Sequence, residues 1–309
     1  MTSAKSEFPT EKNYSIQIMQ HIEKAEILFV INPNAGKRNI KSVLKNIHRI
    51  DSDIKYVITS DLNNLEDTIN KEFNTHKVFV AVGGDGTVNA LIKYLIDHKD
   101  KSLAILPFGS GNGFSNELGF KHDIEYLIRQ IVKGDTLDVD ILEINNNYFI
   151  NLAGIGLDAE IAHKFQTSKE RGFTTYIFST IKTYFTYKPF KATITGKGIN
   201  MDGEYLMISI ANTRQFGNNA YISPTSKAYD GKFEVVALKP IHLFQALPFV
   251  CRLFKGTLSD SKYIHYFTFD DSVFIKTNFN KFHIDGDPLF SDGNYDISIN
   301  KKALRIIKM

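Results

Sequence analysis

The stretch from residue 77 to residue 96, KVFVAVGGDGTVNALIKYLI, constrains the fold of this chain more than any other. It opens with an apolar, β-branched run at 78–82, which is typical of a strand buried on both faces. A glycine turn at 83–87 follows, and residues 89–96 then repeat apolar side chains at helical spacing. Strand, glycine turn and helix present unpaired backbone N–H groups to a phosphate. The stretch therefore predicts an α/β unit that binds a phosphate group at its turn.

This turn contains three glycines, Gly83, Gly84 and Gly86, and one acid, Asp85. Without a Cβ atom, a glycine lets the backbone approach an anion closely and take positive φ angles. Because a carboxylate repels a bare phosphate, Asp85 is expected to organise Mg²⁺ or the turn itself. An ordinary tight turn is the alternative, but such a turn does not need this combination of glycines and an acid. The spacing matches neither the dinucleotide fingerprint nor the Walker A loop.

Two more turns of this kind follow predicted strands. Residues 26–31 and 103–106 are apolar runs that lead into NPNAGK at 32–37 and PFGSGN at 107–112. The other elements predicted before residue 110 are helices at 41–50 and 62–73 and an alternating strand at 53–59. Strands that alternate with helices indicate a parallel sheet with ligand turns at the carboxyl ends of its strands. All three turns fall at such ends, which favours a nucleotide site.

The pattern changes near residues 135–138, where we place a domain boundary. Short alternating segments with Gly and Asn turns take over, which is typical of an antiparallel sandwich or barrel. These segments are 138–144, 148–153, 192–199, 205–210, 233–238, 266–269, 272–277 and 281–284. Two apolar helices, at 172–187 and 241–255, interrupt them. Either helix is suited to line a lipid pocket or lie on a membrane, and packing on a sheet is the alternative, which we favour for 172–187.

Composition narrows the class of protein. The chain has 309 residues, 43% apolar and 23% charged, and a net charge of +3, which is too weak to indicate nucleic acid as a partner. Its single cysteine, Cys251, excludes an internal disulfide framework and suits a reducing cytoplasm; we expect it in a protein core. No signal peptide or run of 18 apolar residues occurs, so no transmembrane segment is expected.

Four motifs together resemble those of a known enzyme family. The turn at 83–87 resembles the glycine motif shared by diacylglycerol kinases, sphingosine and ceramide kinases, NAD kinases and phosphofructokinases. The turn at 32–37 resembles NP-x-[SA]-G-K of the lipid kinases, LPFGSGN at 106–112 resembles L-P-x-G-[TS]-x-N, and DGDP at 285–288 resembles their late D-G-E-x motif. Their order and spacing resemble bacterial members of the diacylglycerol kinase catalytic-domain family over nearly the whole chain.

The resemblance implies a fold, an activity and a nucleotide site. It implies a polar extension at 1–25, a Rossmann-like α/β nucleotide domain with a parallel sheet at 26–137, an antiparallel β-sandwich lipid-binding domain at 138–290, and a segment at 291–309 whose strands, at 295–299 and 304–307, return to the first domain. The implied activity is ATP- and Mg²⁺-dependent phosphorylation of a hydroxyl of diacylglycerol or a sphingoid base. The implied nucleotide-binding residues are Asn32, Pro33, Lys37, Thr59, Gly83, Gly84, Asp85, Gly86, Thr87, Asn89, Gly109, Ser110 and Asn112.

The sequence departs from the family at two positions. Asp287 stands where the family usually has Glu as catalytic base, and its side chain is one methylene shorter. Either Asp287 or the nearby Asp285 is therefore the expected base, and a plain D-G hairpin turn is the alternative. Gly113 follows Asn112 where bacterial diacylglycerol kinases often have Asp; this GSGN form is closer to the sphingosine and ceramide kinases, so the lipid class stays open.

Two metal sites are implied by the resemblance. Asp230, with the backbone carbonyls of Lys227 and Lys232, matches a structural Mg²⁺ site, and Asp158 either completes the catalytic metal network or caps the helix after it. An ordinary turn is the alternative for Asp230. The nine histidines show no zinc-ligand spacing, and His283 is expected only to pack within its strand.

Two other functions stay open: an NAD kinase-like enzyme that shares the glycine motif, and a nucleotide-binding regulator with weakened activity. For the lipid kinase we expect a cytoplasmic protein that visits a membrane surface peripherally and reversibly. A homodimer is the oligomeric partner that we consider for it.

Overall fold

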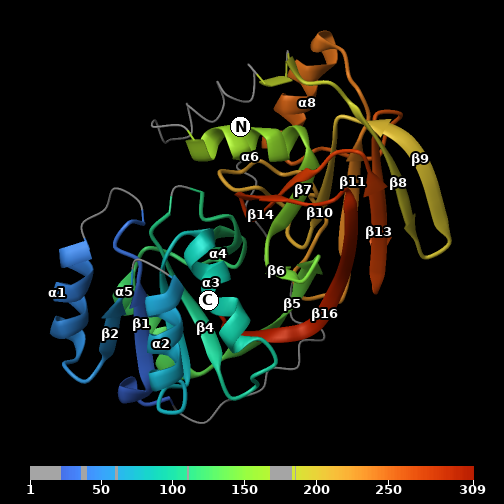
Figure 1. Ribbon diagram of the computed structural model, residues 1–309. Helices are drawn as coiled ribbons and strands as arrows, with labels where there is room; N and C mark the ends of the chain where they lie inside the picture. The colour runs from blue at the N-terminus through green and yellow to red at the C-terminus, as the bar shows by residue number, and fades with distance from the viewer. Residues whose placement is uncertain (1–21, 36–39, 60–61, 110, 168–182, 185) are drawn as a thin grey trace.

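The computed structural model describes residues 22–35, 40–59, 62–109, 111–167, 183–184 and 186–309 (Figure 1). Lys37, Ser110 and most of the helix expected at 172–187 lie outside these ranges. No helix within them is long and apolar enough to cross a membrane.

The first half of the chain forms a parallel sheet flanked by helices. Its strands are β1 (Ile27–Ile31), β2 (Lys55–Ile58), β3 (Val78–Gly83) and β4 (Ser102–Pro107), in the spatial order β2-β1-β3-β4. Every residue of β1, β3 and β4 is buried, as their continuous apolar runs predict. The helices are α1 (Ile40–Ile50), α2 (Leu62–Glu72), α3 (Asp85–Leu95), α4 (Gly113–Glu117) and α5 (Ile124–Lys133), and a 3₁₀ turn, η1 (Lys24–Glu26), precedes β1.

Three helices of this half differ from expectation, because the short α4 was not predicted either. The structure begins α3 at Asp85, inside the glycine turn, whereas the sequence predicted its start at residue 89. Helix α5 was not predicted, although it has clear end signals. Asp123 accepts a hydrogen bond from the backbone N–H of Tyr126 at its start, and Gly134 ends it in the left-handed region.

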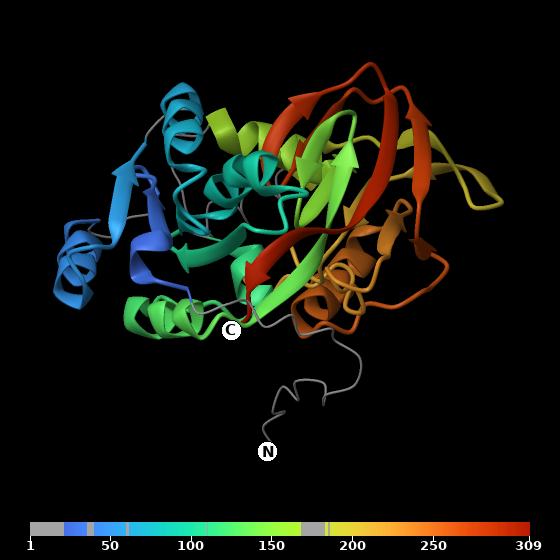
Figure 2. The same ribbon diagram turned by 90° about the horizontal axis from the view of Figure 1, so that it is seen from below.

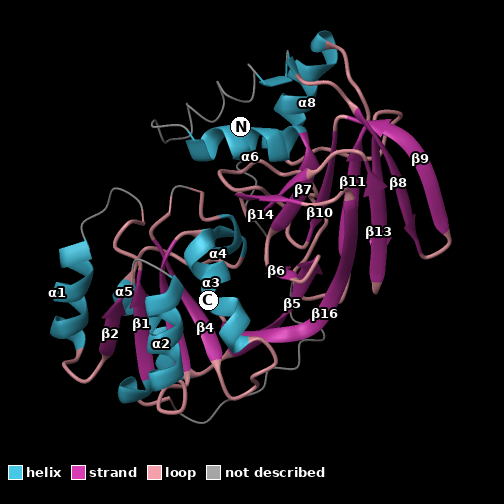
Figure 3. Ribbon diagram, viewed as in Figure 1, coloured by secondary structure: helices cyan, strands magenta, loops and turns pink. Residues whose placement is uncertain are grey.

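The second half of the chain is a two-layered antiparallel sandwich (Figure 3). One layer has the order β12-β11-β10-β7-β14-β15. Its strands are β7 (Leu152–Gly156), β10 (Met207–Ala211), β11 (Phe233–Leu238), β12 (Ile264–Phe269), β14 (Lys281–Ile284) and β15 (Asp287–Phe290). The other layer contains β5 (Thr136–Ile144), β6 (Asn147–Phe149), β8 (Phe190–Gly196), β9 (Ile199–Tyr205), β13 (Ser272–Thr277) and β16 (Asn294–Ile307). Large apolar side chains such as Phe149, Phe233 and Tyr295 fill the space between the layers.

One strand, β16, joins the two halves. It pairs antiparallel with β5 and β13 in the sandwich, and Ile306 near its end pairs in parallel with Leu103 of β4. Figure 2 shows β16 crossing between the halves beside β5. The expected boundary at 137/138 falls within β5, and a single strand replaces the two predicted at 295–299 and 304–307. The architecture confirms the expected N-terminal α/β sheet and C-terminal antiparallel sandwich.

Three other segments differ from prediction in the sandwich. The strand expected at 148–153 is divided into β6 and β7. The strand expected at 192–199 ends at Gly196, because Lys197 and Gly198 turn with positive φ angles into β9, which was not predicted. Strand β15 was also missed.

Two helices cover the outer face of the six-stranded layer. Helix α6 (Leu157–Thr167) and helix α8 (Leu243–Lys255) both contribute side chains to the same apolar cluster, which includes Leu157, Phe249 and Val236. The helix predicted at 241–255 is therefore present, but Cys251 is exposed on α8. The expectation that this cysteine lies in the core is wrong, because it falls on the helix face turned away from the sheet.

Candidate active site

The three glycine turns meet at the carboxyl ends of β1, β3 and β4. The backbone N–H groups of Phe108 and Gly109 donate to the Gly83 carbonyl at 2.7 and 3.3 Å. A Cβ atom on Gly109 would lie 2.5 Å from the Cα of Gly84, so only glycines allow this approach. From the first turn, the Asn32 side chain donates to Thr87 Oγ1 at 3.1 Å. The structure thus places side by side three turns that lie about 25 to 75 residues apart in the sequence.

Two amide oxygens near these turns lack hydrogen-bond partners among the described residues. Asn112, in the left-handed region with φ of 50°, donates to the Gly109 carbonyl at 2.8 Å, but its Oδ1 atom is buried and unpaired. Oδ1 of Asn89 on α3 is likewise buried and unpaired. Thr59 is buried at the end of β2, where its backbone N–H donates to the Ile31 carbonyl. Unpaired buried acceptors favour binding of a cation or a hydrogen-bond donor.

Asp85 connects the second turn to α4. As the first residue of α3, it accepts hydrogen bonds from the N–H groups of Gly113 at 2.9 Å and Phe114 at 3.3 Å, at the start of α4. Burial raises the pKa of Asp85, the two N–H donors offset part of that increase, and the nearby charge of Asp287 adds to it. Of the two expected roles, organisation of the turn is visible in these hydrogen bonds.

Gly113, one of the two departures from the family, has a steric explanation. A Cβ atom at this position would lie 2.7 Å from the Asn151 side-chain nitrogen. Asn151 is buried and donates to the Gln215 carbonyl at 3.2 Å. An aspartate at 113 would therefore require Asn151 to move.

The two acids of the DGDP motif occupy different environments. Asp285 and Gly286 form the turn between β14 and β15, both with positive φ. The Asp285 carboxylate accepts hydrogen bonds from three consecutive N–H groups, those of Ile150, Asn151 and Leu152, at 3.0 to 3.2 Å. These bonds replace sheet pairing and account for the break between β6 and β7. Burial raises the pKa of Asp285 to about 7, against the effect of the three donors.

Asp287 reaches over the glycine turn. It begins β15, is exposed, and its carboxylate accepts no hydrogen bond from any residue in the described ranges. A Cβ atom on Gly86 would lie 3.4 Å from Asp287 Oδ2, so this carboxylate faces the phosphate turn across the two halves of the molecule. Although the residue is exposed, the protein atoms that its carboxylate faces exclude part of the surrounding water and raise the pKa of Asp287, and the nearby His283 offsets part of this increase.

A cluster of buried polar side chains contacts the hairpin formed by β14 and β15. Asp158, on the first turn of α6, accepts a hydrogen bond from the Ser209 hydroxyl at 3.1 Å and lies 3.5 Å from His283 Nε2. The other ring nitrogen of His283 accepts from the Gly286 N–H at 3.4 Å. These side chains surround Gly154, where a Cβ atom would lie 2.0 Å from Asp158 Oδ2. This role of His283 was not predicted, because strand spacing alone does not reveal a partner on another element.

Two acids that were not predicted, Asp140 and Glu234, lie near Asp230 of the predicted structural metal site. The Asp230 carboxylate accepts from the Lys232 N–H at 3.1 Å. The fully buried Asp140 accepts from the N–H groups of Gly231 and Lys302 at 2.7 and 2.8 Å. Burial raises the pKa of Asp140 and of Glu234, and the nearby charge of Asp230 adds to both increases. The sequence signal for Asp140 was an acid at a position of β5 that the strand pattern turns toward the protein interior. No group of three or more His, Cys, Asp or Glu side chains in the described part of the chain could hold a metal by itself.

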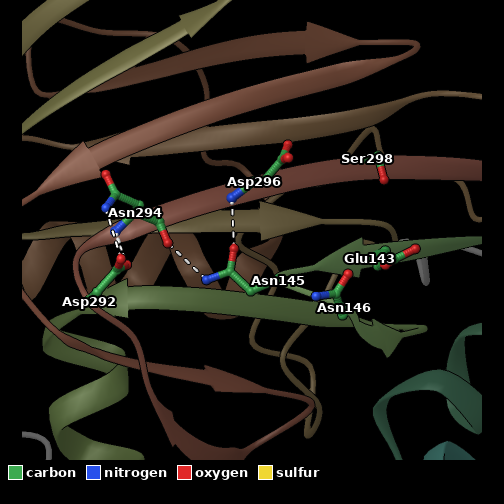
Figure 4. Close-up of a pocket in the computed structure, with 7 residues that line it drawn as sticks. All are labelled: Glu143, Asn145, Asn146, Asp292, Asn294, Asp296 and Ser298. Atoms are coloured by element: carbon green, nitrogen blue, oxygen red, sulfur yellow. Dashed lines mark hydrogen bonds between the residues drawn. The ribbon is translucent and has the colours of Figure 1, made fainter.

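A separate polar pocket lies in the sandwich, away from these turns. Its lining residues are Glu143, Asn145, Asn146, Asp292, Asn294, Asp296 and Ser298 (Figure 4). Hydrogen bonds within the pocket join several of these side chains to one another and to the backbone of β16. None of them was predicted as a site residue, and none is part of the cluster around Asp85 and Asp287.

Comparisons with known proteins identify the family. Residues 26–144 match the diacylglycerol kinase catalytic domain, and residues 151–308, half of the chain, match the YegS C-terminal NAD kinase beta sandwich-like domain. A probable lipid kinase YegS-like of Yersinia enterocolitica is 25% identical over 90% of this chain and 95% of its own length. The diacylglycerol kinase of Bacillus subtilis is 26% identical over 61% of this chain and 64% of its own length.

The fold has close counterparts among solved structures. A putative diacylglycerol kinase from Bacillus anthracis superposes with a TM-score of 0.74 and 22% identity, covering 92% of this chain and 97% of that one. At this identity the likeness concerns the fold. Together with the two matched domains, the converging glycine turns and the acidic hairpin, these relatives lead to one conclusion: the chain belongs to the lipid kinases that join a diacylglycerol kinase catalytic domain to a YegS-type β-sandwich.

Proposed function

We propose that this enzyme transfers the γ-phosphoryl group of ATP to a hydroxyl of diacylglycerol or a related lipid, with Asp287 as the general base. The observation that carries the proposal is the position of the Asp287 carboxylate, which accepts no hydrogen bond from the described residues and faces Gly86 of the phosphate turn. A general base must reach the hydroxyl directly or through one water. Asp285 is less suited to this role because three backbone N–H groups occupy its carboxylate.

ATP would bind along the three turns. Backbone N–H groups at 83–87 and the start of α3 suit the phosphates, because the helix N-terminus carries a partial positive charge. Asn32, Pro33, Thr59, Thr87, Asn89, Gly109 and Asn112 border this region in the proposal. Lys37 and Ser110, which lie outside the described residues, are proposed from the family motifs alone.

Mg²⁺ would fit two places in the proposal. Asp85 and the unpaired Oδ1 of Asn112 offer hard oxygen donors near the transferring phosphate, where the ion would neutralise developing charge. Asp230, with the carbonyls of Lys227 and Lys232, would hold a structural ion, as the family motif implies, and the neighbouring Asp140 would add no ligand because both of its oxygens already accept backbone N–H groups. Asp158 contributes in this proposal through its contact with His283, since its oxygens already have protein partners.

The proposed reaction is tested by a phosphoryl-acceptor panel. Purified protein is incubated with labelled ATP and Mg²⁺ and with diacylglycerol, sphingosine, ceramide or NAD as acceptor. Label on diacylglycerol or a long-chain base is the expected result. Transfer to NAD alone would replace the lipid proposal with an NAD kinase, and nucleotide binding without transfer to any acceptor would indicate a regulator.

The base is tested with paired substitutions in the same assay. We expect Asp287→Asn to lower kcat by roughly 10²- to 10⁴-fold with nearly unchanged ATP affinity, because the proton acceptor is lost. Asp287→Glu should keep substantial activity, since Glu is the residue that the family usually carries there. If Asp287→Asn transfers phosphate to lipid like the parent, Asp287 is not the base.

A further inference from the structure

Helix α8 carries a row of apolar side chains on its solvent side. Phe244 is 91% exposed and Leu247 70% exposed, and Pro248 and Cys251 are exposed as well. These four residues, here called the α8 stripe, follow the i, i+3, i+4, i+7 spacing that places side chains on one helix face. Large exposed apolar side chains that gather on one surface mark an interaction site in most soluble proteins.

The opposite face of α8 packs against the six-stranded layer. Phe249 and Leu253 pack into the apolar cluster beneath α8, together with Leu238 and Ile264 of the six-stranded layer. Gly256 ends the helix in the left-handed region with φ of 64°. The stripe is therefore the outer face of an anchored helix, and its exposure does not come from a frayed end.

Positive charge accompanies the stripe. Residues 239–263 contain four Lys or Arg and one acid, Asp260, a net charge of +3 that equals the net charge of the whole chain. Arg252 and Lys255, both exposed on the last turns of α8, form no ion pair with the residues that the structure describes. An apolar face flanked by cations is complementary to a bilayer with anionic headgroups.

We propose that α8 docks this protein on a bilayer that contains anionic lipid, with Phe244 and Leu247 inserted among the acyl chains. This inference rests on the proposed function, since a kinase acting on membrane lipid must reach the bilayer from the water side. A second copy of the chain is a less suitable occupant. One helix face is small beside the roughly 800 Å² per partner that a stable twofold interface buries.

The position of α8 relates the bilayer to the proposed base. Helices α6 and α8 cover the same face of the six-stranded layer, and Figure 1 shows them along one side of the molecule. At the far edge of that layer, α6 lies against the hairpin that carries Asp287, where His163 contacts the Leu289 carbonyl at 3.0 Å. Phe290 of this hairpin is 68% exposed and packs on the His163 ring. Docking through this layer of helices would bring the edge of the layer that carries the catalytic hairpin close to the lipid.

The sole cysteine supplies a direct probe of docking. Because Cys251 is exposed within the stripe, an environment-sensitive fluorophore attached to it reports the polarity around α8 without an engineered cysteine. We expect a blue shift and a gain in intensity with vesicles of phosphatidylcholine and phosphatidylglycerol, and a much weaker change with phosphatidylcholine alone. Sedimentation of unlabelled protein with the same vesicles checks that the label does not cause binding.

Substitutions separate docking from folding and chemistry. The Phe244→Ser/Leu247→Ser variant should bind anionic vesicles roughly tenfold or more weakly, because the buried apolar area is lost. Arg252→Gln/Lys255→Gln should reduce the preference for anionic lipid. Phe274→Ser, at a side chain 40% exposed on β13 in the other layer, is the matched control and should bind like the parent. All variants should phosphorylate a water-soluble short-chain diacylglycerol at the parental rate.

Several outcomes would overturn the inference. These are an absence of vesicle binding, binding without any change at the Cys251 label, or a concentration-dependent dimer that the Phe244→Ser/Leu247→Ser variant abolishes. If the label responds to anionic vesicles but no lipid is ever phosphorylated, docking stands and the proposed function fails. If the parent protein phosphorylates the short-chain lipid but does not bind vesicles, the proposed function stands and docking through α8 fails.

Discussion

At the scale of single residues, Asp285 shows how one carboxylate can hold two strands in place. It accepts three consecutive N–H groups from residues 150–152, about 130 positions earlier in the chain. An asparagine has one acceptor oxygen in place of two and would leave part of this set unpaired. We expect Asp285→Asn to lower the free energy of unfolding by about 1–3 kcal/mol, measured by urea denaturation.

The matched control is Asp287→Asn, which removes a carboxylate without such donors and should change stability by less than about 0.5 kcal/mol. Equal stability of the two variants would mean that the three contacts of Asp285 contribute little to folding.

The raised pKa of Asp285, about 7, also predicts a pH dependence of stability. An unfolded Asp titrates near pH 4, so between about pH 4 and pH 7 the folded state binds more protons at this site than the unfolded state. The contribution of Asp285 to the free energy of unfolding therefore falls as pH rises through this window. We would measure the free energy of unfolding of the parent and of Asp285→Asn by urea denaturation at several pH values. The decrease between about pH 4 and pH 7 should be larger in the parent by the contribution of Asp285. Curves of unfolding free energy against pH that run parallel for the two proteins would contradict this prediction.

At the scale of elements, Asp85 joins two helix starts. It is the first residue of α3 and accepts the N–H groups of Gly113 and Phe114 at the start of α4, so it determines how two of the three glycine turns meet. We expect Asp85→Asn to keep the fold while lowering kcat by about 10²-fold or more, since the transferring phosphate depends on this arrangement. Circular dichroism checks the fold and the lipid kinase assay checks turnover; near-parental turnover would remove the glycine turn from the mechanism.

At the scale of the whole molecule, β16 makes one sheet of the two halves. Ile306, 1% exposed, pairs with Leu103 of β4, while the earlier part of the same strand lies in the sandwich. We expect Ile306→Ala to lower the free energy of unfolding by about 2–4 kcal/mol, and to speed amide hydrogen exchange in β4. Lys301→Ala, at an exposed position of the same strand, should have little effect; equal effects of the two would argue against a joining role for β16.

The sequence by itself determined the features that depend on neighbouring residues. The apolar runs at 78–82 and 103–106 are too uniformly hydrophobic to be anything but buried strands, and their glycine turns follow directly. Motif order then led to the family, and the matches to both of its domains confirm it. These signals are local because strand burial and turn geometry depend on side chains within a few positions of one another.

Only the tertiary structure decided which distant groups meet. The break after β6 follows from Asp285, the exposure of Cys251 follows from the helix face that meets the sheet, and the course of β16 follows from pairing with β4 and β5. Asp285 and Asp287 look alike in the motif, yet one is held by three N–H groups and the other faces the phosphate turn. Hydrogen bonds and burial between residues more than 100 positions apart leave no periodic trace in the sequence, so the fold alone separates these two acids.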